Sequence, residues 1–142
     1  MDALFVTRDM QKDDLPLVNA LGGSEGFGQV QPDDAVRVAV NEDGEIVGFL
    51  RLAFGEQGEA HVNPVVVYET WRRFGVGRTL LNEALRTYKE LRLVARGWTI
   101  PFYEALGFEP CNWEDISKTV AAECDGCEMR GGCHPQPMSM RL

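Results

Sequence analysis

Four runs of strand-forming residues lie in the first half of the chain, and short polar turns separate the last three. The four runs are Ala3–Arg8, Ala35–Val40, Glu45–Phe54 and Glu59–Val67. Asp43-Gly44 lies in the first short turn and Gly58 in the second, and such residues supply the positive φ values of tight turns. The pattern therefore predicts three consecutive antiparallel strands after a first, separate strand.

Helical spacing of hydrophobic residues predicts three helices. The first begins at Asp13-Asp14-Leu15-Pro16, with an acidic cap and a proline in its first turn, and ends at Gly22-Gly23. The second runs from Val76 to about Glu90, and the third contains Phe102, Tyr103 and Leu106 and is closed by Gly107. Further strands are predicted at Leu91–Ala95, from Phe108 and at Pro137–Leu142, and Ser24–Asp34 is predicted to be a loop or a short helix.

This order of elements predicts an α/β (α+β) fold in which helices flank a mixed, mainly antiparallel sheet. A length of 142 residues is normal for one domain, so residues 1–142 are predicted to form a single domain. Only the part beyond Trp113 differs in character, and residues 111–142 are predicted to be a cysteine-rich C-terminal extension of that domain.

Composition narrows the classes of function. No apolar run approaches the roughly 20 residues of a membrane-spanning helix, and the start of the chain lacks the basic residues of a signal peptide, so a cytoplasmic location without membrane contact is expected. The net charge of −8 argues against nucleic-acid binding, which depends largely on Lys and Arg. A negative field could attract a cationic amine, although acidity is also a common route to solubility. Any anionic ligand must be bound by local chemistry.

Such local chemistry is present where the strand ending at Val67 leads into the second helix. The segment between them carries Gly75 and Gly77, whose lack of side chains lets backbone N–H groups reach an anion. A helix N-terminus adds unpaired donors and partial positive charge. Arg72, Arg73 and Arg78 add full positive charge. The segment predicts a pyrophosphate cradle, although it has neither the Lys-Ser/Thr of a P-loop nor the glycine spacing of a dinucleotide site.

Here the sequence resembles the GCN5-related N-acetyltransferase (GNAT) superfamily. Arg72-Arg73-Phe74-Gly75-Val76-Gly77 matches the family signature Arg/Gln-x-x-Gly-x-Gly/Ala, and Phe102 through Phe108 is similar to the family pattern Phe-Tyr-x-x-x-Gly-Phe. The resemblance covers about residues 3–110. Taken singly, the first motif is also compatible with a plain helix-entry turn and the second with core aromatic residues. Their order and spacing together favour the family.

The resemblance implies acetyl-CoA as co-substrate. The expected cofactor-binding residues are Val65, Val66, Val67, Arg72, Arg73, Phe74, Gly75, Val76, Gly77 and Arg78. Amides from Arg73 to Arg78 would bind the pyrophosphate, the main chain of Val65 and Val67 would pair with the pantetheine arm, and the amide of Val67 would point at the acetyl oxygen. Glu69 stands where relatives often have proline, which implies an altered loop.

Acetyl transfer to an amine needs a base for the ammonium proton and an acid for the leaving thiolate. Tyr103 matches the family tyrosine that often serves as the acid, and a packing aromatic is the alternative. His61 is the first candidate for the base, because imidazole titrates near neutrality, although a lone histidine on a strand is often structural. Glu59 acting through water is the second candidate, and many relatives use only ordered water.

The four cysteines lie in the last third of the chain. Cys124, Cys127, Cys133 and His134 have the ligand types of a structural zinc site, with Cys111 as an alternative ligand. Free or redox-active thiols and a structural disulfide are the other interpretations. This region is also a candidate lid over the amine site.

Together these features predict an acetyl-CoA-dependent N-acetyltransferase that acts on a primary amine of a small molecule, with an amino acid as the weak favourite. A peptide N-terminus, a polyamine and an antibiotic amine remain open as acceptors. A non-catalytic acyl-CoA-binding or metal- or redox-responsive regulatory module is the alternative. A homodimer is common among similar enzymes, and the sequence leaves the oligomeric state open.

Overall fold

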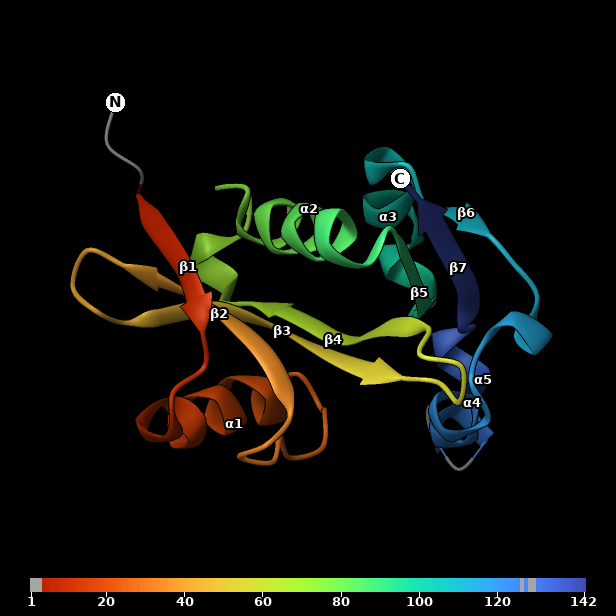
Figure 1. Cartoon of the computed structure of the whole chain (residues 1–142), viewed down its shortest axis with the longest axis horizontal. Helices are drawn as coiled ribbons and strands as arrows, with labels where there is room; N and C mark the ends of the chain where they lie inside the picture. Colours follow the sequence, from red (N-terminus) through yellow and green to blue (C-terminus); the bar gives the residue numbers. More distant parts are fainter. Residues whose placement is uncertain (1–3, 126, 128–129) are drawn as a thin grey trace. The chain divides into compact units, whose positions relative to one another are not determined.

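The computed structural model describes residues 4–125, 127 and 130–142 (Figure 1). Its strands are β1 (Phe5–Asp9), β2 (Ala35–Asn41), β3 (Ile46–Phe54), β4 (Ala60–Val67), β5 (Glu90–Ala95), β6 (Glu109–Pro110) and β7 (Gln136–Arg141). Its α-helices are α1 (Leu15–Ser24), α2 (Val76–Tyr88), α3 (Ile100–Leu106), α4 (Lys118–Asp125) and α5 (Arg130–Cys133). Short 3-10 turns lie at η1 (Lys12–Asp14), η2 (Glu69–Trp71), η3 (Gly97–Thr99) and η4 (Trp113–Asp115).

The packing divides the chain into two compact units. The first comprises Met1–Leu52 and Pro64–Glu83, and the second comprises Ala53–Asn63 and Ala84–Leu142. In the first unit β1, β2, β3 and the end of β4 follow one another in the sheet, and both β1–β2 and β2–β3 are antiparallel. In the second unit the order is β4, β5, β7, β6, with β4–β5 parallel and the other two pairs antiparallel. The predicted mixed, mainly antiparallel sheet is confirmed.

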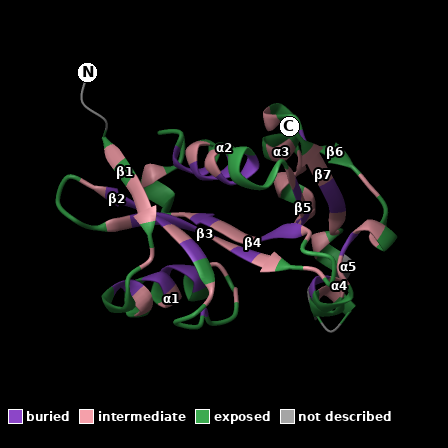
Figure 2. Ribbon diagram, in the orientation of Figure 1, coloured by how far each residue is buried: buried purple, intermediate pink, exposed green. Residues whose placement is uncertain are grey.

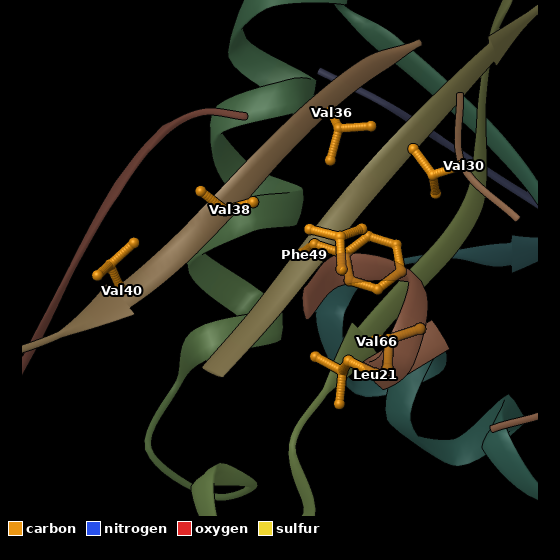
Figure 3. Close-up of a cluster of buried hydrophobic side chains, with 8 residues drawn as sticks. Leu21, Val30, Val36, Val38, Val40, Phe49 and Val66 are labelled. Atoms are coloured by element: carbon orange, nitrogen blue, oxygen red, sulfur yellow. The ribbon is translucent and has the colours of Figure 1, made fainter. Parts of the chain in front are cut away.

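A cluster of buried hydrophobic side chains forms the core of the first unit (Figure 3). Its members are Val18, Leu21, Val30, Val36, Val38, Val40, Phe49 and Val66. Neighbouring residues of a strand point to opposite faces of a sheet. Phe49 lies against Gly22 of α1, whereas Gly48 lies against Val76 at the start of α2. The two helices therefore cover opposite faces of β3, as Figure 1 also shows.

Two details of α1 differ from the sequence prediction. The helix does not end at Gly22-Gly23 but continues to Ser24. Gly22 is buried, and a Cβ atom there would lie 3.2 Å from Cζ of Phe49, so this glycine serves close packing and does not terminate the helix. Asp14 occupies the N-cap position of α1, but its carboxylate accepts hydrogen bonds from Arg8 and from the amide of Gln11 instead of capping α1.

The second unit is built around β5, whose alternating pattern buries Leu91, Leu93 and Ala95 on one face (Figure 2). Met138 of β7 is fully buried beside them in the register of the antiparallel pair. Gly107 ends α3 with a φ of 106°, as the sequence predicts. The predicted strand from Phe108 is short, because β6 comprises only Glu109–Pro110. None of the described helices combines the length and the apolar character that crossing a bilayer requires.

Candidate functional site

The end of β4 and the start of α2 form a loop with an unusual backbone, all within the first unit. The amide of Tyr68 donates to the carbonyl of Val47 at 2.8 Å, which holds the end of β4 on β3. After η2 the chain passes through Arg73 and Gly75, which both have a φ of 81°. Positive φ is uncommon for a residue with a side chain, so Arg73 marks a constrained backbone in the middle of the signature.

This backbone leaves a set of N–H groups at the start of α2. The first helical hydrogen bond runs from the amide of Thr79 to the carbonyl of Gly75, at 2.9 Å. The amides of Val76, Gly77 and Arg78 precede that bond and so have no acceptor within the helix. Arg73, Gly75 and Arg78 are exposed, and nothing lies within 4 Å of the position of a Cβ atom on Gly75. The loop can therefore hold a polyphosphate anion through amides, the helix dipole and two guanidinium groups.

Tyr103, the predicted general acid, lies in α3 of the second unit. Its ring makes edge-on contacts with Phe102 and Phe108, at centroid distances of 5.1 Å and 5.5 Å. Burial raises the pKa of Tyr103 to about 12, and the charge of Arg96 opposes this rise only in part. The phenol therefore carries its proton at neutral pH and can donate it.

His61, the first candidate for the base, is completely buried in β4. Its Nδ1 lies 3.0 Å from the carbonyl oxygen of Glu59, and its Nε2 accepts the amide hydrogen of Ser117 at 3.0 Å. A carbonyl can only accept and an amide can only donate, so the two partners select the neutral tautomer with the proton on Nδ1. Both ring nitrogens are thus engaged by the main chain, which favours the structural interpretation of His61.

Glu59, the second candidate, folds back over the turn before β4. Its Oε1 accepts the amide hydrogen of Gln57 at 2.6 Å, and hydrogen bonds from its own amide and from that of Gln57 lower the pKa of its carboxyl group. Glu59 lines an open cleft of about 270 Å³ in the second unit, together with Arg92, Asp115 and Ser117. The carboxylate is therefore ionised at neutral pH beside a volume that water can enter.

A sequence model of the acetyltransferase (GNAT) family matches residues 8–108. The chain belongs to this family. The match includes the signature loop and the motif around Tyr103, so the predicted family and enzyme class, an N-acetyltransferase of the GNAT type, are confirmed. No curated protein matches the sequence.

Solved structures show the same GNAT fold at low sequence identity. N-acetylglutamate synthase from Neisseria gonorrhoeae, complexed with coenzyme A and N-acetyl-glutamate, has a TM-score of 0.77 and 16% identity over 100% of this chain and 36% of its own. Rv2747 from Mycobacterium tuberculosis, in complex with CoA, has a TM-score of 0.77 and 16% identity over 96% of this chain and 99% of its own. Nourseothricin acetyltransferase has a TM-score of 0.70 and 22% identity over 97% of this chain and 98% of its own. This chain thus spans about a third of the Neisseria enzyme.

Arg72, the first arginine of the GNAT signature, stabilises the loop through two contacts of its side chain. Nε of Arg72 donates to the carbonyl of Val67 at 3.2 Å, and its Nη2 lies 2.6 Å from a carboxylate oxygen of Glu25. Sequence reasoning grouped Arg72 with the cofactor-binding residues and missed Glu25, which lies 47 positions away. The ion pair joins the GNAT loop to the polar segment after α1.

Gly48 is another residue that the sequence prediction missed. A Cβ atom there would lie 2.8 Å from Cγ1 of Val76 and 3.0 Å from the carbonyl oxygen of Val66. Only glycine therefore allows β3 to approach the end of β4 and the first residue of α2 so closely. A glycine within an otherwise apolar strand was the available signal for this close contact.

The predicted zinc site is not supported. In the part of the chain that the structure describes, no group of three or more His, Cys, Asp or Glu side chains lies where it could hold a metal ion. The four cysteines are all reduced, so the structural disulfide is also not formed. The reason lies in the main chain, because Cys124 is in α4 whereas Cys133 ends α5 and packs with His134 against Gly97. The zinc prediction at Cys124, Cys127, Cys133 and His134 is therefore withdrawn.

Proposed function

We propose that this chain transfers the acetyl group of acetyl-CoA to the primary amine of a small molecule, with an amino acid as the favoured acceptor. The observation that carries the proposal is the loop between β4 and α2, with positive φ at Arg73 and Gly75 and three amides free of helical partners. Support also comes from the structures of similar fold that contain coenzyme A. The Neisseria complex with N-acetyl-glutamate supports an amino acid as the acceptor. The similarity to nourseothricin acetyltransferase supports an antibiotic amine as the alternative acceptor.

In this proposal the amides of Arg73 through Arg78 bind the pyrophosphate of the coenzyme. The main chain of Val65 and Val67, which are both half-buried residues, pairs with the pantetheine arm as an added strand would. The neutral amine nitrogen then attacks the thioester carbon, a C–N bond forms and the C–S bond breaks. The amine loses one proton, and Tyr103 supplies one to the departing thiolate.

We propose that the amine proton passes through a water molecule to the carboxylate of Glu59. The two main-chain hydrogen bonds of His61 occupy both nitrogens, so His61 would have to break one of them to accept a proton. The ionised carboxylate of Glu59 borders a cleft that water can enter. Water-mediated transfer therefore requires no rearrangement of a buried ring.

The experiment is a panel of amines incubated with acetyl-CoA and the purified protein, with release of the coenzyme thiol as the readout. Acetyl-CoA binding is measured by calorimetry on the same sample. We expect binding together with thiol release for at least one small amine. Binding without release for any amine would favour the acyl-CoA-binding module instead.

A matched pair of glycine variants tests the loop itself. Gly75 and Gly44 have φ values of 81° and 79°, and neither has an atom within 4 Å of its Cβ position. A valine at either site therefore imposes similar backbone strain, but only Gly75 lies in the loop. We expect Gly75→Val to weaken acetyl-CoA binding by more than about tenfold, which is 1.4 kcal/mol, and Gly44→Val to leave it unchanged. Equal affinities in the two variants would contradict the proposed cradle.

A further inference from the structure

Cys124 and Cys127 lie at and just beyond the end of helix α4. The amide of Cys127 donates to the carbonyl of Cys124 at 3.2 Å, so the main chains of the two residues are in direct contact. A hydrogen bond from the amide of residue i+3 to the carbonyl of residue i keeps their Cα atoms within about 7 Å of each other. Disulfides span Cα distances of about 4.4–6.8 Å. The backbone therefore brings the two Cα atoms close to the range that a disulfide spans, although both cysteines are reduced.

Cys127 is more exposed than Cys111. Cys127 is exposed and Cys124 is half-buried, so a small reagent can reach the pair from solvent. Cys111 is half-buried, and burial together with the charge of Asp115 raises the pKa of its thiol, although a hydrogen bond with Ser139 opposes this rise. A thiol with a raised pKa has a smaller thiolate fraction and reacts more slowly.

The helix that carries Cys124 is fixed on β4 at two points. The amide of Ser117, just before α4, donates to His61, and the carboxylate of Glu123 accepts a hydrogen bond from the side chain of Asn63 at 3.0 Å. Cys124 is thus carried by a helix that two hydrogen bonds attach to β4.

The main chain of Cys133 packs against η3. A Cβ atom on Gly97 would lie 2.6 Å from the carbonyl oxygen of Cys133 and 3.3 Å from Cβ of His134. The end of α5 therefore rests closely on η3.

We propose that Cys124 and Cys127 are a redox-modification site that forms a reversible disulfide by exchange with an oxidised low-molecular-weight disulfide. The exposed thiolate of Cys127 attacks one sulfur of that compound, which releases its first thiol and leaves a mixed disulfide on Cys127. The thiolate of Cys124 then attacks the sulfur of Cys127, and the second thiol departs. The two cysteines lose two electrons and two protons in total, and the compound gains two electrons and becomes two thiols.

The experiment uses the whole protein, fully reduced and then incubated with oxidised glutathione. Titration of free thiols is expected to fall from four to two, and mapping of unreduced peptides is expected to link Cys124 to Cys127. Dithiothreitol should restore all four thiols. A bond that includes Cys133 or Cys111, or four thiols that stay unchanged, would overturn the proposal.

Serine variants complete the test. Cys124→Ser and Cys127→Ser are each expected to abolish the internal disulfide, and Cys124→Ser should retain glutathione on Cys127 as a stable mixed disulfide. Cys111→Ser is the control and should still form the Cys124–Cys127 bond. Loss of that bond in the control would show that Cys111 takes part and would contradict the assignment. The readouts do not depend on acetyl transfer, so the outcome is separate from that of the proposed function.

Discussion

The proposed proton transfer to the thiolate depends on the phenol group of Tyr103. Its hydroxyl stays protonated at neutral pH, because burial raises its pKa to about 12. We expect Tyr103→Phe to lower kcat by about 100-fold or more, because a positioned acid typically contributes a factor of this size. The KM for acetyl-CoA should change little, because in the proposed mechanism the phenol acts only on the departing sulfur.

Tyr88→Phe is the matched control for this prediction. Tyr88 is exposed, and its ring centroid lies 5.5 Å from that of Phe54. The substitution therefore removes the same hydroxyl group from a tyrosine that also packs against a phenylalanine. Steady-state kinetics of the two variants distinguish the roles. A Tyr103→Phe enzyme with the kcat of Tyr88→Phe would exclude Tyr103 as the acid.

Asp14 gives the first unit a stability that depends on pH. The residue is 8% exposed, and its carboxylate binds Arg8 at 2.6 Å and accepts the amide hydrogen of Gln11 at 2.7 Å. The hydrogen bond from Arg8 is the largest cause of the lowered pKa of this carboxyl group. A folded-state pKa below the unfolded value of about 3.9 means that the stabilisation is present above that value and is lost as pH falls through the folded-state pKa.

We therefore expect Asp14→Asn to lower the free energy of unfolding at pH 7 by about 1–2 kcal/mol, the size of a charge-assisted hydrogen bond beside a partly exposed arginine. The variant should also show a weaker loss of stability as the pH falls below about 4. Urea denaturation at several pH values measures both effects. Asp13→Asn, which removes an exposed carboxylate next to it, is the control and should match the native protein.

Some properties of single residues could be predicted from the sequence, whereas others depend on contacts with distant residues. Tyr103 and the loop glycines could be predicted, because their motifs are local and their spacing is fixed. The environment of His61 could not, because its partner Ser117 lies 56 positions further along the chain. For the same reason Glu25, which pairs with Arg72, left no signal in the sequence.

At the scale of elements, Gly48 determines how closely β3 approaches the start of α2. We expect Gly48→Ala to lower the free energy of unfolding by about 1–3 kcal/mol, because its added methyl group would lie 2.8 Å from Val76 and 3.0 Å from a rigid carbonyl. Gly23→Ala should have the opposite sign and add about 0.5–1 kcal/mol, because Gly23 lies in α1 with nothing within 4 Å. Thermal unfolding of both variants tests the pair, and equal effects would contradict the close-packing argument.

Strands, turns and the long amphipathic helix were predictable from local pattern alone. The turns carry glycines at positive φ, for example Gly44 and Gly58, and these need no knowledge of distant residues. The end of α1 was not predictable in this way. Gly22 ends no helix because Phe49 packs against it, and this contact joins residues 27 positions apart (49 − 22).

The charge of the whole molecule bears on the acceptor. A net charge of −8 produces a negative field that salt screens over about 10 Å at 0.1 M ionic strength. We compare an accepted amino acid with its amide, which has the same side chain but one more positive charge. We expect kcat/KM of the amide to fall several-fold between about 0.01 and 0.5 M salt, and that of the zwitterion to change less. Parallel salt profiles for the two acceptors would show that the field does not steer them.

The position of β7 bears on how the protein is made. This strand follows every other described element along the chain, yet it lies between β5 and β6 and pairs with β5 over six successive residues. While the ribosome is still synthesising residues 136–141, β5 has an unsatisfied edge that can bind a chaperone or another nascent chain. A premature stop codon just before Gln136 would delete an interior strand rather than a tail, so quality control should remove the truncated product.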